Sequence, residues 1–163
     1  EAYPERFAEC SQHLALAYLV IPLSEQGDRI RAGVAVTALR GALRVYRKDT
    51  HPVAWASATS NLANALQYLP SAFPEQHLTE ALDLYEQVLQ ERSATTDPVG
   101  CARVLANQAN ALAHLGAFPD ARDRLQRARE LFVSVGDTDG AAHVDELLAE
   151  VASSERDAPR PEA

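Results

Sequence analysis

Apolar residues recur every three or four positions along almost the whole chain, and no segment alternates between apolar and polar residues for long enough to form a strand. This periodicity predicts an all-α protein. Pro4, Pro52 and Pro98 are expected near the starts of three helices, because proline fits the first helical position. The expected first helices are 5–20, 52–69 and 98–115, their partner helices are 30–48, 77–93 and 119–135, and the last helix is 139–152.

One arrangement of small and large residues occurs three times in this pattern. In the first helices, Ala15, Ala63 and Ala109 occupy equivalent small positions, 48 and then 46 residues apart. The partner helix of each hairpin contains a second alanine and, four residues after it, a large side chain: Ala35/Leu39, Ala81/Tyr85 and Ala121/Leu125. A helical hairpin cannot bury its apolar stripe alone, so such hairpins stack, with small residues where helices approach closely. We expect a stack of three hairpins with a C-terminal capping helix.

The repeats define the expected domain organisation. A helical-repeat domain is predicted at 1–152, with repeats at about 4–51, 52–97 and 98–138 and a cap at 139–152. Residues 153–163 contain two prolines and no apolar period, which predicts a disordered tail or linker. The sequence opens at Glu1 and contains no Met, so we expect it to be part of a longer protein or a processed chain.

Residues 102–135 resemble the tetratricopeptide repeat (TPR) family in their 34-residue length and in their large, small and Asn positions. These positions are Leu105, Asn107, Ala109, Asn110, Leu112, Gly116, Phe118, Ala121, Leu125 and Ala128. The small positions of a hairpin are 12 residues apart in this repeat, but 20 and 18 apart in the elongated first and second repeats. Prolines around 22–27 and 70–74 favour loops for the extra residues. The resemblance implies a right-handed solenoid of about seven helices.

In the TPR family the first helices line a concave groove, and the resemblance therefore implies a binding surface here. Asn and Gln side chains, which both donate and accept hydrogen bonds, are frequent at the matching positions and suit an extended peptide backbone. We interpret the protein as a non-enzymatic protein–protein interaction module that binds an extended peptide or partner protein in this groove. The candidate groove residues are His13, Asn61, Asn64, Gln67, Tyr68, Arg103, Asn107, Asn110 and His114.

Two alternatives remain open. The first is a structural, regulatory or self-associating segment of a larger bacterial signalling protein, since residues 130–142 resemble hairpin junctions in such proteins. Opposite charges at the two ends of the repeat domain favour self-association. The charged residues concerned are Arg40, Arg44 and Arg47 at one end and Asp145, Glu146 and Glu150 at the other. The second alternative is an unrecognised enzyme or small-molecule binder that uses a pocket under the inserted loops.

Composition and charge limit the kinds of partner and the cellular compartment that we expect for this protein. A net charge of −8 disfavours nucleic-acid binding, which usually needs clustered Lys and Arg. No apolar run approaches the length of a membrane span, so we expect no membrane contact. Cys10 and Cys101 lie in first helices two repeats apart, which predicts free thiols and a cytoplasmic protein. A single Lys beside many Arg and Ala suggests a bacterial source.

Candidate catalytic or metal-binding motifs are sparse. The five histidines are scattered, and the chain contains no H-E-x-x-H, C-x-x-C, Gly-rich phosphate loop or G-x-S-x-G. The tightest set is Asp139, His143 and Glu146 on one expected helix, which we interpret as a solvated face. We expect no catalytic residue, no metal site and no cofactor.

Overall fold

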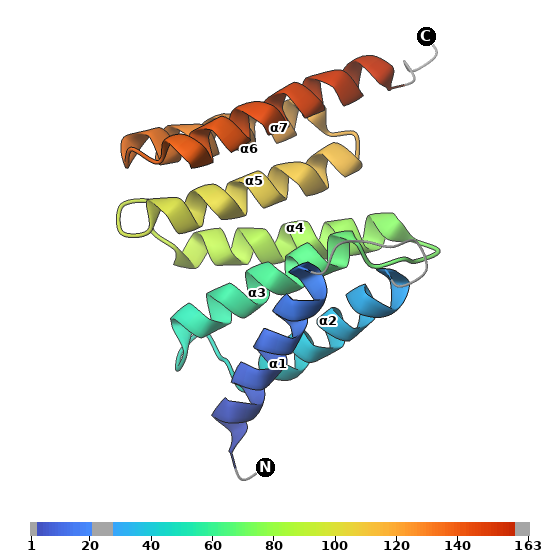
Figure 1. Ribbon diagram of the computed structural model, residues 1–163, viewed down its shortest axis with the longest axis vertical. Coiled ribbons are helices and arrows are strands. Elements are labelled where there is room, and N and C mark those ends of the chain that lie inside the picture. Colours follow the sequence, from blue (N-terminus) through green and yellow to red (C-terminus); the bar gives the residue numbers. More distant parts are fainter. Residues whose placement is uncertain (1–2, 21–27, 159–163) are drawn as a thin grey trace. The chain divides into compact units, whose positions relative to one another are not determined.

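The computed structural model describes residues 3–20 and 28–158, apart from the side chains of residues 28 and 29. Within these residues the chain is all-α, with seven helices and no strand, which confirms the expected fold class (Figure 1). The helices are α1 (Pro4–Val20), α2 (Asp28–Ala42), α3 (Pro52–Gln67), α4 (Pro74–Glu91), α5 (Pro98–His114), α6 (Phe118–Ser134) and α7 (Thr138–Asp157). No helix in the described ranges is both long and apolar enough to cross a membrane.

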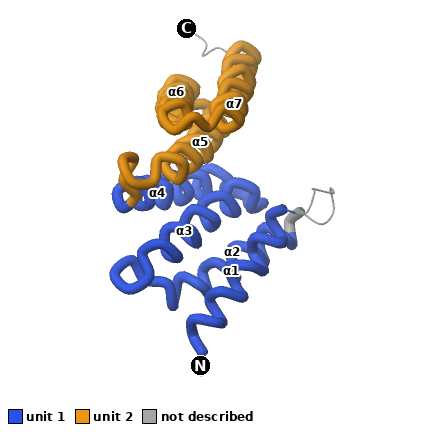
Figure 2. The backbone as a smooth tube through the Cα atoms, turned by 60° about the vertical axis from the view of Figure 1, so that its left-hand side comes forward, with its two compact units in different colours: residues 1–91 blue, residues 92–163 orange. Residues whose placement is uncertain are grey.

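The chain forms two compact units, residues 1–91 and residues 92–163 (Figure 2). In unit 1, α1 pairs with α2 and α3 pairs with α4, and the two hairpins stack through α2 and α3. In unit 2, α5 pairs with α6, α7 packs against α6, and α7 also meets α5. Each unit therefore places a first helix beside a helix that follows it in the stack: α1 beside α3, and α5 beside α7.

The recurring small and large positions form the core of each unit, as their spacing predicted. In unit 1, Leu39 and Tyr85 are completely buried, as are the alanines at the close helix contacts. In unit 2 the alanines are also completely buried and Leu125 is 1 % exposed. These buried alanines are Ala15, Ala35, Ala63 and Ala81 in unit 1, and Ala109 and Ala121 in unit 2.

Local residues set the beginnings and ends of most helices. Pro4, Pro52 and Pro98 are the first residues of α1, α3 and α5. The carboxylate of Asp97 accepts a hydrogen bond from the backbone N–H of Gly100 at 2.9 Å, and Asp137 caps α7 in the same way through Gly140 at 2.8 Å. Each cap satisfies a backbone donor that has no partner within the helix.

Gly116 and Gly136 end α5 and α6 by the same turn. Both have a positive φ, 76° and 72°, a conformation that glycine adopts without steric cost. The backbone N–H of Ala117 then donates to the carbonyl of Leu112, and that of Asp137 donates to the carbonyl of Phe132. These bonds satisfy carbonyl groups at the helix ends and leave short connections on both sides of α6.

Three predicted boundaries are wrong, each by a few residues. Helix α2 ends at Ala42 rather than 48, because the chain turns at 43–45 and brings Tyr46 into the core beside His51, with ring centroids 5.7 Å apart. Helix α4 begins at Pro74 rather than 77, so the extra residues of the second hairpin are divided between the loop 68–73 and an added helical turn.

The third corrected boundary concerns the C-terminal tail. Helix α7 continues to Asp157, so residues 153–157 are helical where a disordered tail was expected. Arg122 of α6 forms a two-pronged ion pair with Glu155, which fixes this added turn to α6. The inserted loop predicted around 22–27 lies outside the described residues.

Candidate functional site

In unit 1 the predicted groove residues lie on the first helices of the two hairpins, α1 and α3, or directly after α3. The side-chain amide of Gln12 donates a hydrogen bond to the hydroxyl of Ser57 at 3.0 Å, which joins the two helices directly. His13 is exposed on α1, and Asn61 is half-buried on α3. Unit 1 therefore carries a polar surface across two first helices.

Asn64 and Gln67, two of the predicted groove residues, bind a group inside unit 1. The hydroxyl of the fully buried Tyr85 donates to the Oδ1 atom of Asn64 and accepts from the Nε2 atom of Gln67 at 2.6 Å. Burial raises the pKa of Tyr85 far above its ordinary value, so the phenol stays protonated. Both carboxamides thus serve the contact between α3 and α4. Tyr68, which follows α3, is 54 % exposed and belongs to the loop side of this hairpin.

In unit 2 the predicted groove residues lie along α5. Arg103 and His114 are exposed, whereas Asn107 and Asn110 are half-buried and already interact with other groups of the protein. Spacings of three and four residues keep these side chains on one side of the helix. Asn110 and His114, near the C-terminal end of α5, lie where α7 meets α5.

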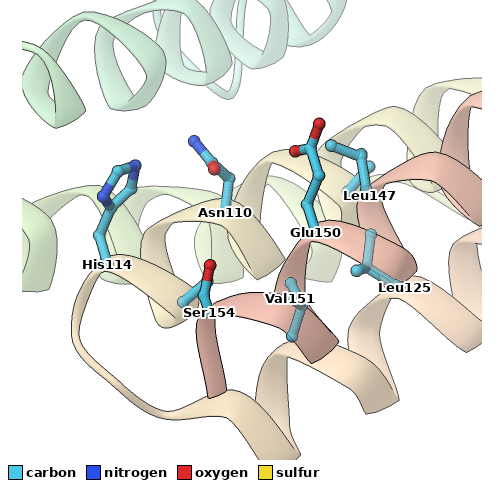
Figure 3. A pocket seen from close by; sticks show the side chains of 9 residues that line it. Asn110, His114, Leu125, Leu147, Glu150, Val151 and Ser154 are labelled. Carbon is cyan, nitrogen blue, oxygen red and sulfur yellow. The ribbon is translucent and has the colours of Figure 1, made fainter. Parts of the chain in front are cut away.

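A pocket of about 230 Å³ opens between α5 and α7 in unit 2 (Figure 3). Leu125 and Val151 lie at its base, and the side chains of Asn110, His114 and Glu150 project in the same direction at its rim. Its full lining consists of Ala106, Asn110, Ala113, His114, Leu125, Leu147, Glu150, Val151 and Ser154. Apolar groups form the floor and polar groups form the rim, so the pocket can bury one aliphatic side chain and hydrogen-bond the chain around it.

Three rim side chains are available to a ligand. Among the described residues, His114, Glu150 and Ser154 have no side-chain hydrogen-bond or ion-pair partner. Two other acidic residues of α7 are paired: Asp145 with Arg129 at 2.6 Å, and Glu155 with Arg122. Glu150 therefore places an unpaired carboxylate at the pocket, while these two paired carboxylates hold α7 to α6.

The sequence identified the α5 half of this pocket and missed the α7 half. Asn110 and His114 were groove candidates, but Glu150 was assigned only to an acidic end, and Ser154 to the tail. The available signal was the pattern on α7, in which Glu150 and Ser154 are four residues apart beside Leu147 and Val151, also four apart. This pattern places an apolar and a polar row side by side on one face of the helix.

A second hollow, of about 620 Å³, lies on the α1/α2 hairpin of unit 1. Three of its large side chains are unusually exposed: Phe7 is 44 %, Leu14 is 47 % and Ile30 is 71 % accessible. Its lining residues are Phe7, Ser11, Leu14, Ile30, Gly33, Val34, Thr37, Ala38 and Gly41. Neither this hollow nor the α5/α7 pocket is lined by the inserted loop 68–73.

The candidate metal-binding set and the cysteines are not brought into a reactive cluster. His143 contacts Glu146 at 3.6 Å, but no group of three His, Cys, Asp or Glu arranged to hold a metal occurs within the described ranges. Cys10 and Cys101 are free thiols. Burial, and next the charge of Asp97, raises the pKa of Cys101, which makes it a poor nucleophile.

Three basic residues near the end of the first repeat are paired within unit 1. Arg40 binds Glu80 at 2.9 Å, Lys48 binds Glu91 at 2.6 Å, and Arg47 approaches Asp49 at 3.5 Å. In the acidic helix α7, Asp145 is likewise paired with Arg129. These local pairs weaken the argument that opposite charges drive head-to-tail association.

Comparison of the chain with models of known protein families gave no match, and comparison with curated proteins gave none either. The resemblance to TPR proteins stays a prediction that depends on the residues of the third repeat and on the hairpin spacing.

Proposed function

We propose that the protein is an interaction module of the TPR type that binds an extended segment of a partner protein, with its principal contact in the α5/α7 pocket. The observation that carries this proposal is the apolar floor of that pocket beneath a polar rim, on which His114, Glu150 and Ser154 have no partner among the described residues. An aliphatic side chain fills such a floor, and His114 and Ser154 offer hydrogen bonds to the adjoining peptide backbone.

The size of the pocket favours a single side chain over a whole small molecule. Its volume of about 230 Å³ is below the roughly 300–1,000 Å³ typical of small-molecule sites. The exposed residues of α5, including Arg103, extend the polar surface beyond the pocket. A bound segment would then be held by one buried side chain and by several backbone contacts, as in a peptide-binding repeat protein.

A random-peptide phage library selected on the immobilised full chain tests this proposal. Enriched peptides are synthesised, and their affinities are measured by fluorescence anisotropy for the wild type and for Ser154→Trp, whose indole would fill the pocket. Burying one Leu-sized side chain contributes roughly 1.5–3 kcal/mol, so at about 1.4 kcal/mol per decade the variant should bind about ten- to a hundredfold more weakly.

Ser153→Trp is the matched control, because Ser153 is also exposed, at the preceding position of α7, but does not line the pocket. It should bind the same peptides with wild-type affinity. Circular dichroism should show the same helical content for both variants. Equal affinities of wild type and Ser154→Trp, or a library without enriched sequences, would contradict the proposed function.

A second candidate function, self-association, is favoured by the α1/α2 hollow. Large apolar side chains are exposed there, and a Cβ atom added at Gly33 would meet no atom within 4 Å, which leaves room for a helix of a second copy. Exposed apolar patches of this kind are typical of protein interfaces. Two copies joined through this same surface would form a closed, isologous dimer.

Sedimentation-equilibrium measurements distinguish this candidate from the first. The wild type should form dimers, and Ile30→Asp, at a 71 % exposed position of the hollow, should be monomeric. Val53→Asp adds the same charge at an 80 % exposed position outside the hollow and should leave the dimer intact. A wild-type monomer at the highest soluble concentration rules out self-association through this surface.

A further inference from the structure

We infer that the segment bound in the α5/α7 pocket carries a Lys or Arg close to its aliphatic anchor, and that the carboxylate of Glu150 receives this cation. The inference rests on the proposed function and specifies the partner of the same site. It concerns the charge of the ligand, which the apolar floor does not determine.

The charges at the pocket support a basic partner. Glu150 is the one acidic residue of the lining, and the lining contains no Lys or Arg. In the described part of the chain this carboxylate has no ion-pair partner, unlike Asp145 and Glu155 on the same helix. A cationic side chain that reaches the rim would therefore meet a carboxylate that no protein cation competes for.

The neighbouring groups suit the donors of a cation. Asn110, His114 and Ser154 line the same pocket on one side of Glu150 (Figure 3), and carboxamide, imidazole and hydroxyl groups can each accept a hydrogen bond. Lys and Arg carry several N–H donors and no acceptor. Because Leu147 and Val151 lie within one turn of Glu150, the cation and the aliphatic anchor must be near each other in the bound segment.

The same arrangement discriminates against acidic segments. A carboxylate next to the anchor would face Glu150 directly, and like charges across an interface oppose binding. The net charge of −8 adds a field that concentrates cationic and repels anionic ligands. The pocket would thus both attract basic peptides and disfavour acidic ones.

The experiment uses the peptides enriched by the wild-type chain in the phage selection. Relative to the starting library, these sequences should contain an excess of Lys or Arg within a few residues of a Leu, Ile, Val or Met. Glu150→Gln should weaken their binding about two- to fivefold, as expected for an ion pair at an exposed rim at about 1.4 kcal/mol per decade. Glu130→Gln, an exposed acid of α6 outside the pocket, removes the same charge and should change the affinity little.

A charge swap separates the direct contact from the general field. Glu150→Lys should abolish binding of a basic peptide. The same variant should bind a version of that peptide in which the Lys or Arg is replaced by Glu. Glu130→Lys should neither lose the basic peptide nor gain the acidic one. Enriched peptides without a basic residue, or equal losses for the Glu150 and Glu130 variants, would overturn the inference. If Ser154→Trp still prevents binding in that case, the proposed function stands, whereas a library without enriched peptides contradicts both.

Discussion

Replacing Tyr85 by alanine is expected to lower the free energy of unfolding by about 3–5 kcal/mol, the usual cost of removing a large buried ring. Tyr85 is completely buried between α3 and α4, and its hydroxyl binds both Asn64 and Gln67. Its removal leaves a cavity and deprives two half-buried carboxamides of a partner. Urea denaturation followed by far-ultraviolet circular dichroism measures the change.

One further variant separates the contribution of the hydroxyl from that of the ring, and a second serves as a control. Tyr85→Phe keeps the ring and removes the hydroxyl, so it should cost about 1–3 kcal/mol, the penalty for unsatisfied polar groups. Tyr68→Ala removes a tyrosine that is 54 % exposed and should stay within about 0.5 kcal/mol of wild type. A Tyr85→Ala protein as stable as wild type would show that this tyrosine does not anchor the hairpin.

Val144→Asp is expected to destabilise unit 2 by about 3–5 kcal/mol, because it places an unpaired charge at a buried position. Val144 is completely buried on the side of α7 that packs on the rest of the unit. The neighbouring Asp145 already pairs with Arg129, so this cation could reach the new carboxylate only by breaking that pair. Amide hydrogen exchange should show early loss of protection in α6 and α7.

Ala142→Asp is the matched control for this substitution. It adds the same charge to the same helix at an exposed position, so its unfolding free energy should change by about 0.5 kcal/mol or less. If both variants are equally stable, α7 does not form part of the core of unit 2.

The local signals in the sequence predicted the helices well, and tertiary contacts explain where they failed. Proline gave the starts of α1, α3 and α5, and would also have given α4 if Pro74 had been read as a first helical residue. The residues after Ala42 contain no stop signal. Helix α2 ends there because Tyr46 turns into the core, a contact that no local pattern reveals.

The candidate site shows the same division between local and distant information. Helical spacing placed Asn110 and His114 together on α5, but Glu150 and Ser154 join them only because α7 returns along α6 and meets α5. The spacing likewise put Asn64 on the groove side, whereas its binding partner, the hydroxyl of Tyr85, lies 21 residues away on the next helix. Patterns within one helix identify a face, and packing decides what that face contacts.

The ion pairs and the close contact along α6 and α7 have a consequence for the affinity of the proposed binding. Arg122–Glu155 and Arg129–Asp145 join the helices at two levels, and Gly140 lies against the ring of Phe132 at a third. A slide by one helical turn would move α7 by about 5.4 Å and separate both pairs. These contacts hold α7 against α6 in the unbound protein, so a segment that binds in the α5/α7 pocket as proposed would lose little affinity to reorganisation of α7.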